Sequence, residues 1–257
     1  MESIINIIVD QDKCTGCGEC AADCLRHVLE VRDGKARVLS GDCMKCGHCL
    51  AVCPANAVRM EGIEDEILEK CESAGMLDAD SLKTHLKLRR SVRQYKQTPV
   101  DREKLEKIIE AGRLTPSGSN LHNVRYIVVQ NGINELEDEV IAQYREMGSL
   151  PGGPDMSKYK LKRGFLFYNA PALILVVSEN SVNACLAAMS MELMAEALGL
   201  GTVYVGLFTR PANQNAALRQ SLGVTQNENI AICLAVGYPA VTYQRSAPKK
   251  PANVVWR

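Results

Sequence analysis

The stretch "KCTGCGECAADCL", residues 13–25, places four cysteines within eleven positions, and "DCMKCGHCLAVCP", residues 42–54, does the same again. The first set is Cys14, Cys17, Cys20 and Cys24, and the second is Cys43, Cys46, Cys49 and Cys53. Each cysteine recurs 29 positions later (14 to 43, 17 to 46, 20 to 49 and 24 to 53). The front of the chain is therefore an internal duplication built around thiols.

Composition limits the kinds of protein to consider. The chain has 257 residues, enough for one large domain or two ordinary ones, and its formal net charge is zero, so we expect neither nucleic acid nor an acidic membrane as a partner. Its longest apolar runs are too short to cross a bilayer. The opening "MESIINIIVD" lacks the basic region of a signal peptide, and we predict a cytoplasmic protein.

A cytoplasmic location decides how the cysteines are interpreted, because thiols in a reducing compartment serve as metal ligands or redox groups more often than as disulfides. The spacing C-x2-C-x2-C-x3-C is that of bacterial [4Fe–4S] ferredoxins, in which the fourth cysteine of each run binds the other cluster. We therefore predict two clusters. The first is held by Cys14, Cys17, Cys20 and Cys53, and the second by Cys43, Cys46, Cys49 and Cys24.

Zinc is the main alternative for these cysteines. Paired C-x2-C knuckles could bind it, but they would leave the third and fourth cysteine of each run unexplained. Residues 1–60 resemble a bacterial-type two-cluster ferredoxin. One departure is Leu25, where that family usually has a proline, whereas Pro54 keeps it in the second run. His27 and His48 lie beside the cluster loops, and we expect them to be exposed or to be indirect partners rather than ligands.

Beyond residue 60 the pattern changes. Residues 61–85 are charged and amphipathic and predict a helical connector. From residue 86 the pattern mixes helices and strands. Helices are expected over 101–114, 133–147, 181–201 and 213–223, and strands over 124–130, 172–178, 202–206 and 229–239. The helix 181–201 is apolar on most sides, so we expect it, Cys185 within it, and Cys233 in the last strand to be buried.

Four separated stretches of the second domain carry a resemblance. They are "RRSVRQY" (89–95), "TPSGSNLHN" (115–123), "GLGTVYVGLF" (199–208) and the region from "LAVGYP" to "KKP" (234–251). In this order they resemble the FMN-dependent nitroreductase family over roughly residues 86–257. No dinucleotide fingerprint and no P-loop is found. The fold class that we predict is α+β, a two-cluster ferredoxin-like domain followed by a nitroreductase-like α+β domain that binds FMN.

The resemblance also implies FMN-binding residues. In the family the first stretch binds the phosphate and the nearby flavin edge, a role suited to planar arginine donors, and the second stretch is a loop that commonly reaches the flavin from the partner subunit. Carried over, the first gives Arg89, Arg90, Ser91 and Arg93, and the second gives Pro116, Ser117, Ser119 and Asn120. Gly206 would bring a backbone N–H toward the flavin, and Lys249 would close on the phosphate.

The function that follows is an enzyme in which FMN carries the chemistry and no side chain is assigned as catalytic. It would reduce nitroaromatic compounds, quinones or similar electron-poor molecules. NAD(P)H is the usual donor in the family, but two fused clusters indicate a relay from an external reduced ferredoxin, a low-potential donor that suits anaerobic metabolism. The resemblance further implies a homodimer. Residues 147–164 form a long irregular segment that is either a lid over the flavin or a plain surface loop.

Three other functions stay open from the sequence. One is a non-enzymatic electron carrier or redox sensor that passes electrons to a protein partner. Another is an enzyme of the same fold that performs reductive dehalogenation or flavin fragmentation. The last is a structural metal domain fused to an inactive scaffold, which would contain no flavin.

Overall fold

The computed structural model describes residues 7–39, 41–61, 69, 75–148 and 154–257. The chain forms two compact units, Met1–Leu77 and Asp78–Arg257, and each is described by itself. The predicted connector, residues 61–85, crosses this division. Much of it lies outside the described residues, and its last part begins helix α3 (Ala79–Leu88).

The first unit repeats one small motif. Strand β1 (Ile7–Val9) pairs antiparallel with β4 (Val58–Met60), and β2 (Leu29–Arg32) pairs antiparallel with β3 (Lys35–Val38). Two four-residue helices, α1 (Glu19–Ala22) and α2 (His48–Ala51), lie 29 positions apart in the sequence. The strand pairs repeat with the same offset. Leu29 pairs with Val38 and Val58 pairs with Val9, and Val58 and Val38 stand 29 positions after Leu29 and Val9. The duplication in sequence is thus a duplication in structure, and β1 and both short helices are elements that the sequence did not predict.

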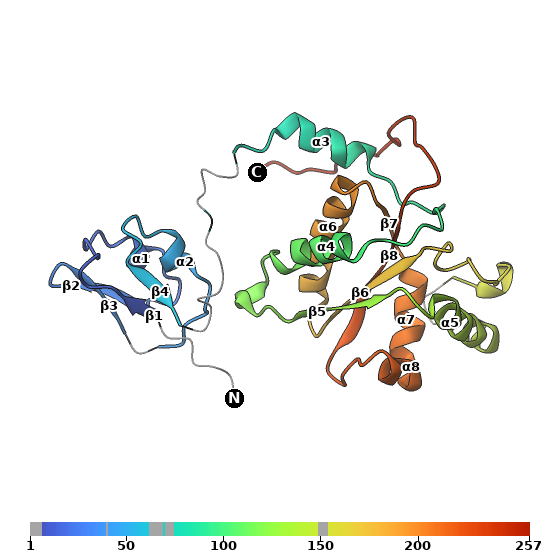
Figure 1. Cartoon of the computed structure of the whole chain (residues 1–257), viewed down its shortest axis with the longest axis horizontal. Helices are drawn as coiled ribbons and strands as arrows, with labels where there is room; N and C mark the ends of the chain where they lie inside the picture. Colours follow the sequence, from blue (N-terminus) through green and yellow to red (C-terminus); the bar gives the residue numbers. More distant parts are fainter. Residues whose placement is uncertain (1–6, 40, 62–68, 70–74, 149–153) are drawn as a thin grey trace. The chain divides into compact units, whose positions relative to one another are not determined.

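The second unit is a four-stranded antiparallel sheet between two layers of helices (Figure 1). The strand order is β5 (Val124–Val129), β6 (Ala172–Ser178), β8 (Asn229–Gly237) and β7 (Gly201–Tyr204). Helices α4 (Arg102–Arg113) and α6 (Ser181–Ala197) cover one face. Helices α5 (Ile133–Met147), α7 (Gly206–Gln214) and α8 (Ala216–Ser221) cover the other. The predicted α+β fold class is therefore confirmed.

Strand β6 shows why the sequence of this sheet does not alternate between apolar and polar residues. All seven of its residues are buried. Ile174 and Val176 belong to the core against α4 and α6, whereas Leu173 and Leu175 belong to the core against α5 and α7. Because helices exclude water from both faces, both sets of alternate positions must be apolar. The prediction of an internal strand over residues 172–178 is confirmed.

Helix α6 differs from its prediction. It ends at Ala197 rather than near residue 201, and only one side of it is buried. Cys185 is exposed, so the prediction that it belongs to the core is wrong, whereas Cys233 is buried as expected. Val182, Leu186 and Met189 keep 64%, 47% and 38% of their surface exposed. They share one stripe of the helix because they are spaced by four and three residues.

In the second unit, helix α7 was not predicted from the sequence. It begins at Gly206, directly after the predicted strand, and contains Pro211. Glycine and proline both have low helix propensity, so Gly206 and Pro211 argued against a helix in this stretch. Pro211 lies in the second turn, and Asn215 marks the end of the helix and caps α8 by accepting from the Leu218 N–H at 3.0 Å.

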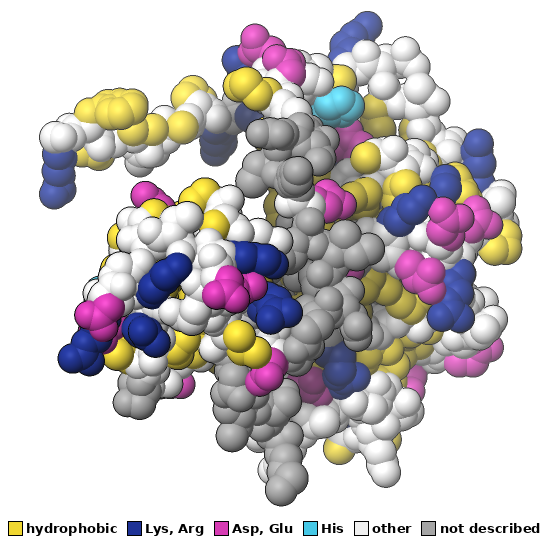
Figure 2. Space-filling view, turned by 60° about the vertical axis from the view of Figure 1, so that its left-hand side comes forward, with side chains coloured by type: hydrophobic (Ala, Val, Ile, Leu, Met, Phe, Trp, Pro, Cys, Tyr) yellow, Lys and Arg dark blue, Asp and Glu magenta, His cyan; other side chains and the backbone are white. Residues whose placement is uncertain are grey.

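None of the described helices is long and apolar enough to span a membrane. On the face shown in Figure 2, acidic and basic side chains are interspersed over the described residues. A short 3-10 helix, η3 (Met156–Lys158), lies within the segment 147–164, of which residues 149–153 fall outside the described part.

The carboxylate of Glu137 holds the end of that segment. Glu137 is 1% exposed, and its two oxygens accept hydrogen bonds from the backbone N–H groups of Gly164 (2.6 Å), Leu166 (2.6 Å) and Phe167 (3.1 Å). A buried carboxylate without such donors would be costly, so these three bonds account for an acidic residue inside α5.

We predict that Glu137→Gln destabilises the second unit by about 2–3 kcal/mol, because one amide –NH₂ would then face a backbone donor. Urea unfolding measures the loss. Glu146→Gln in the same helix is the control, since Glu146 is exposed. Equal unfolding midpoints for the two variants would contradict this assignment.

Candidate functional site

The eight cysteines of the two repeats surround two hollows. One hollow, of about 320 Å³, is lined by Cys14, Cys17, Cys20 and Cys53. The other, of about 360 Å³, is lined by Cys24, Cys43, Cys46 and Cys49. In each hollow three thiols come from one repeat and the fourth comes from the other repeat. The structure therefore brings the cysteines together in the two sets that the spacing predicts, and their role as ligands stays a prediction.

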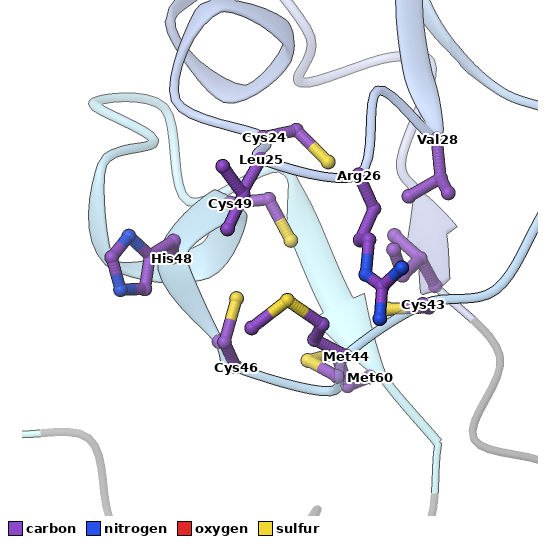
Figure 3. A pocket seen from close by; sticks show the side chains of 12 residues that line it. Cys24, Leu25, Arg26, Val28, Cys43, Met44, Cys46, His48, Cys49 and Met60 are labelled. Atoms are coloured by element: carbon purple, nitrogen blue, oxygen red, sulfur yellow. The ribbon is translucent and has the colours of Figure 1, made fainter. Parts of the chain in front are cut away.

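Figure 3 shows the second hollow from close by. The thiols of Cys24, Cys46 and Cys49 point into a common space, whereas the imidazole of His48 points away from it. His48 Nδ1 lies 3.0 Å from Asp23 Oδ2, which ties α2 to the end of α1. His48 is 62% exposed and is not directed at the thiols, and that it is not a ligand stays a prediction.

The two short helices position the third thiol of each triplet. Gly18 and Gly47 precede α1 and α2 with φ of 85° and 73°, which turns the chain so that Cys20 and Cys49 face inward. Burial raises the pKa of Cys49 to about 11 and also raises the pKa of Cys20. At neutral pH both thiols would be protonated unless a cationic group binds them, as iron does.

The donor set fits iron–sulfur clusters. Each hollow offers four soft sulfur donors, the complete set for one [4Fe–4S] cluster, and all ten described cysteines are free. Among the residues that the structure describes, no group of three or more His, Cys, Asp and Glu side chains is arranged for a single metal ion. Each site is therefore defined by its four thiols and the hollow between them.

The β2–β3 hairpin closes over the first cysteine loop. Lys35 Nζ donates to the carbonyls of Gln11 (2.7 Å) and Cys14 (2.6 Å), and the Ala36 N–H donates to Cys14 Sγ at 3.3 Å. The hydrogen bond from the Ala36 N–H makes the largest contribution to lowering the pKa of Cys14. A Cβ on Gly16 would lie 2.0 Å from the Gly34 carbonyl oxygen, so the hairpin turn requires glycine at position 16.

The arginine-rich stretch of the second unit lies along the edge of the sheet. Ser91 forms a parallel bridge with Thr202 of β7, and the Val92 N–H donates to the Thr202 carbonyl at 2.9 Å. Tyr95 forms an antiparallel bridge with Pro239, just after β8. Residues 91–95 thus run as an additional extended segment between β7 and the chain after β8.

This extended segment buries two side chains and exposes the two residues between them. Val92 and Tyr95 are buried. Arg93 is exposed and lies over the Tyr168 ring at 5.9 Å. Arg90 lies over the Tyr243 ring at 5.8 Å. The apolar residues fix the strand, and its cations remain available at the surface.

Arg89 and Arg90 line an open pocket of about 480 Å³ together with Glu192 and Tyr243. Arg89 Nε is buried and has no hydrogen-bond partner in the described structure. A buried guanidinium N–H needs an acceptor, and a phosphate group supplies several oxygens in a geometry that suits arginine. These residues fit the phosphate of a flavin nucleotide.

The loop with the second predicted set lies elsewhere. The Gly118 N–H donates to Asn183 Oδ1 at 3.0 Å, at the start of α6. Ser117 Oγ accepts from the His122 N–H at 3.0 Å, and Asn120 and Ser119 adopt positive φ. Pro116 precedes this short 3-10 turn, η2 (Gly118–Asn120). The turn of this loop is thus held at the start of α6, whereas Thr115 at the start of the loop donates to Ser190 Oγ at 2.7 Å, further along the same helix.

The separation follows from helix geometry. Asn183 and Glu192 are nine residues apart on α6, which is about 14 Å at ~1.5 Å per residue. Within one chain, therefore, Ser117 and Asn120 do not join Arg89.

Gly206 is exposed at the first residue of α7, and Lys249 is exposed in the irregular segment after β8.

Three residues at this site were not predicted to take part. Glu192 lies in a helix whose apolar sequence gave no reason to single it out, and Tyr168 and Tyr243 stand far from the arginines in the chain. Only their contacts with Arg89, Arg93 and Arg90 identify them.

Comparison with known proteins agrees with the two-part organisation. Residues 86–238 match the family model described as the nitroreductase family, and residues 6–54 match that of a 4Fe-4S dicluster domain. An Archaeoglobus fulgidus protein named for NADH dehydrogenase or NAD(P)H nitroreductase activity is 29% identical over 161 residues, which are 59% of this chain and 81% of that protein.

Two further relatives extend the picture. Iodotyrosine deiodinase of Daphnia pulex is 30% identical over 182 residues, which are 60% of this chain and 57% of that protein. The crystal structure of a nitroreductase with bound FMN from Bacteroides fragilis superposes with a TM-score of 0.56 at 24% identity. The match covers 70% of this chain and all of that one. This likeness shows the fold.

We predict that Gly16→Ala removes about half of the iron, that of the first cluster, because the new methyl group would displace the hairpin that covers Cys14. Iron and sulfide analysis after anaerobic purification measures the loss.

Lys45→Ala is the matched control, since Lys45 stands 29 positions after Gly16 and has φ of 57° without being glycine. Full iron content in Gly16→Ala, or equal losses in both variants, would show that the hairpin does not constrain the first loop.

Proposed function

The chain belongs to the nitroreductase family, and from that premise we propose that it is an FMN-dependent oxidoreductase whose ferredoxin domain supplies the electrons. Its acceptors would be nitroaromatic compounds, quinones or similar electron-poor molecules. Bound FMN would supply two-electron transfer, and bound [4Fe–4S] clusters would supply single electrons. A cytoplasmic location is part of this proposal.

One observation carries the FMN proposal. The arginine segment is fixed along β7 and directs Arg89 and Arg90 into one pocket, where a buried N–H lacks an acceptor. Arg89, Arg90, Ser91 and Arg93 would bind the phosphate end. Gly206, exposed where α7 begins, would present its backbone N–H to the flavin ring, and Lys249 would add a further positive charge to the phosphate.

Anaerobic purification followed by iron, sulfide and FMN analysis tests the proposal. We expect two [4Fe–4S] clusters and one FMN per chain, and full reduction by reduced ferredoxin. Protein that contains iron but neither retains nor takes up FMN would refute it. Comparing NADH with reduced ferredoxin then identifies the donor. Equally fast flavin reduction after Cys14→Ser and Cys43→Ser would exclude the clusters as the entry route.

Reductive dehalogenation is the second candidate, and the similarity to iodotyrosine deiodinases favours it. Both reactions need a reduced flavin and an aromatic acceptor, so the same site could serve either. Halide release from halogenated phenols, measured beside the turnover of nitroaromatics and quinones with one donor, separates them. Turnover of none of these compounds would favour an electron carrier.

We further propose that the protein is a homodimer in which the loop 115–123 of one chain completes the FMN site of the other. Two observations support this proposal. The turn of the loop at Gly118 is anchored at Asn183, about 14 Å along α6 from Glu192, whereas Thr115 at its start reaches Ser190. The apolar stripe of Val182, Leu186 and Met189 is exposed on the same helix. A stripe of this kind is what a helix buries against a partner.

We predict that Leu186→Glu converts the dimer to monomers and lowers FMN affinity at least tenfold, because the partner loop leaves the site. Sedimentation velocity and quenching of FMN fluorescence measure the two effects. Met147→Glu is the control, because Met147 is 49% exposed at the end of α5. A Leu186→Glu variant that keeps both the parental mass and the parental affinity would refute the dimer.

A further inference from the structure

Arg89 is held by a buried carboxylate that no motif contains. Its Nη1 donates to Glu192 Oε1, and the second oxygen, Oε2, accepts from the Tyr204 hydroxyl at 3.2 Å. The Glu192 side chain is 3% exposed and that of Arg89 is 25% exposed. Arg89 comes from the end of α3, Glu192 from α6 and Tyr204 from β7, so three elements meet at one carboxylate.

The carboxylate restricts where the guanidinium can go. A buried charge is stable only when it keeps its partners, so Glu192 fixes the position of Nη1. An unrestrained arginine loses side-chain conformational entropy when it binds an anion. Arg89 is already held by Glu192, so its binding of an anion would cost less entropy. With one side of the guanidinium on Glu192, Nε is left buried and without an acceptor.

Charge alone does not explain the pocket. Glu192 and Glu196 line it together with Arg89 and Arg90, and Glu196 also pairs with His85 at 3.3 Å. The two acidic residues offset the two arginines, so a site that attracted anions only by net charge would be weak. Recognition must then depend on the geometry of the donors.

We propose that Glu192 is a positioning residue that orients Arg89 toward the phosphate group of the flavin nucleotide, and so sets the preference for FMN over riboflavin. The inference rests on the proposed function, because it concerns the same FMN site. Glu192 acts through Arg89 and does not itself touch the ligand. What matters is where its oxygens lie, and the negative charge is secondary.

Two conservative variants separate position from charge. Glu192→Asp keeps the charge but withdraws the oxygens by one methylene, so Arg89 is no longer held. Glu192→Gln removes the charge but keeps an oxygen within reach of Nη1, and its amide can donate to the Tyr204 oxygen. Both changes are smaller than truncation to alanine, and thermal unfolding of each variant shows whether it folds.

The experiment measures dissociation constants for FMN and for riboflavin with the full-length, flavin-depleted protein. We expect Glu192→Asp to lower the FMN-to-riboflavin affinity ratio at least tenfold, and Glu192→Gln to stay within threefold of the parent. A folded Glu192→Asp variant with the parental affinity ratio would overturn the inference. A tenfold rise of that ratio in Glu192→Gln would also overturn it, because the effect would then be due to charge. If Glu192→Asp does not fold, Tyr204→Phe takes its place with an expected loss of at least threefold, and an unchanged ratio overturns the inference.

The parent protein separates this inference from the function on which it rests. If the parent binds neither flavin, the proposed function fails. If the parent prefers FMN and both variants keep that preference, only the role of Glu192 fails.

Discussion

The backbone approach between Val92 and β7 is the constraint on which the second unit depends. The Val92 N–H reaches the Thr202 carbonyl at 2.9 Å, and this is possible only because Gly201 has no side chain. A Cβ on Gly201 would lie 2.4 Å from Val92 Cγ2. Once Val92 is fixed, Arg90 and Arg93 are held on either side of it, and Arg89 meets Glu192 at the end of α3. The pocket that we propose for a nucleotide phosphate thus depends on a close contact between two backbones.

The first unit depends on a different constraint, the exchange of the fourth cysteine between its repeats. Cys53 completes the hollow of the first triplet and Cys24 that of the second, so neither repeat offers four thiols by itself. The strand pairs follow the same exchange, because β1 of the first repeat pairs with β4 of the second. Binding of two clusters would therefore fasten the repeats together, and the small cores around Leu29 and Val58 need contribute less to stability.

The sequence predicted what local patterns determine and missed what distant contacts determine. The cysteine sets follow from spacing alone, and the long helix over 133–147 and the strand over 172–178 are periodic or continuous enough to be predicted. Helix α7 was missed because Gly206 and Pro211 both argue against a helix, and the four-residue helices α1 and α2 are too short to show a period. The exposure of Cys185 could not be foreseen, since an apolar helix reads the same whether its own chain or a partner covers it. Glu192 is 103 positions from Arg89, and only the fold brings them together.

The central claim is that electrons held by the thiol-bound clusters of the first unit reach an organic acceptor through a flavin bound in the second. The most direct test reduces the clusters anaerobically, mixes the protein with a nitroaromatic acceptor in a stopped-flow instrument, and follows the return of cluster absorbance with and without bound FMN. We expect rapid reoxidation in the FMN-loaded protein and little in the flavin-depleted protein. Equal rates in both would contradict the account, because the clusters would then reduce the acceptor without the second unit.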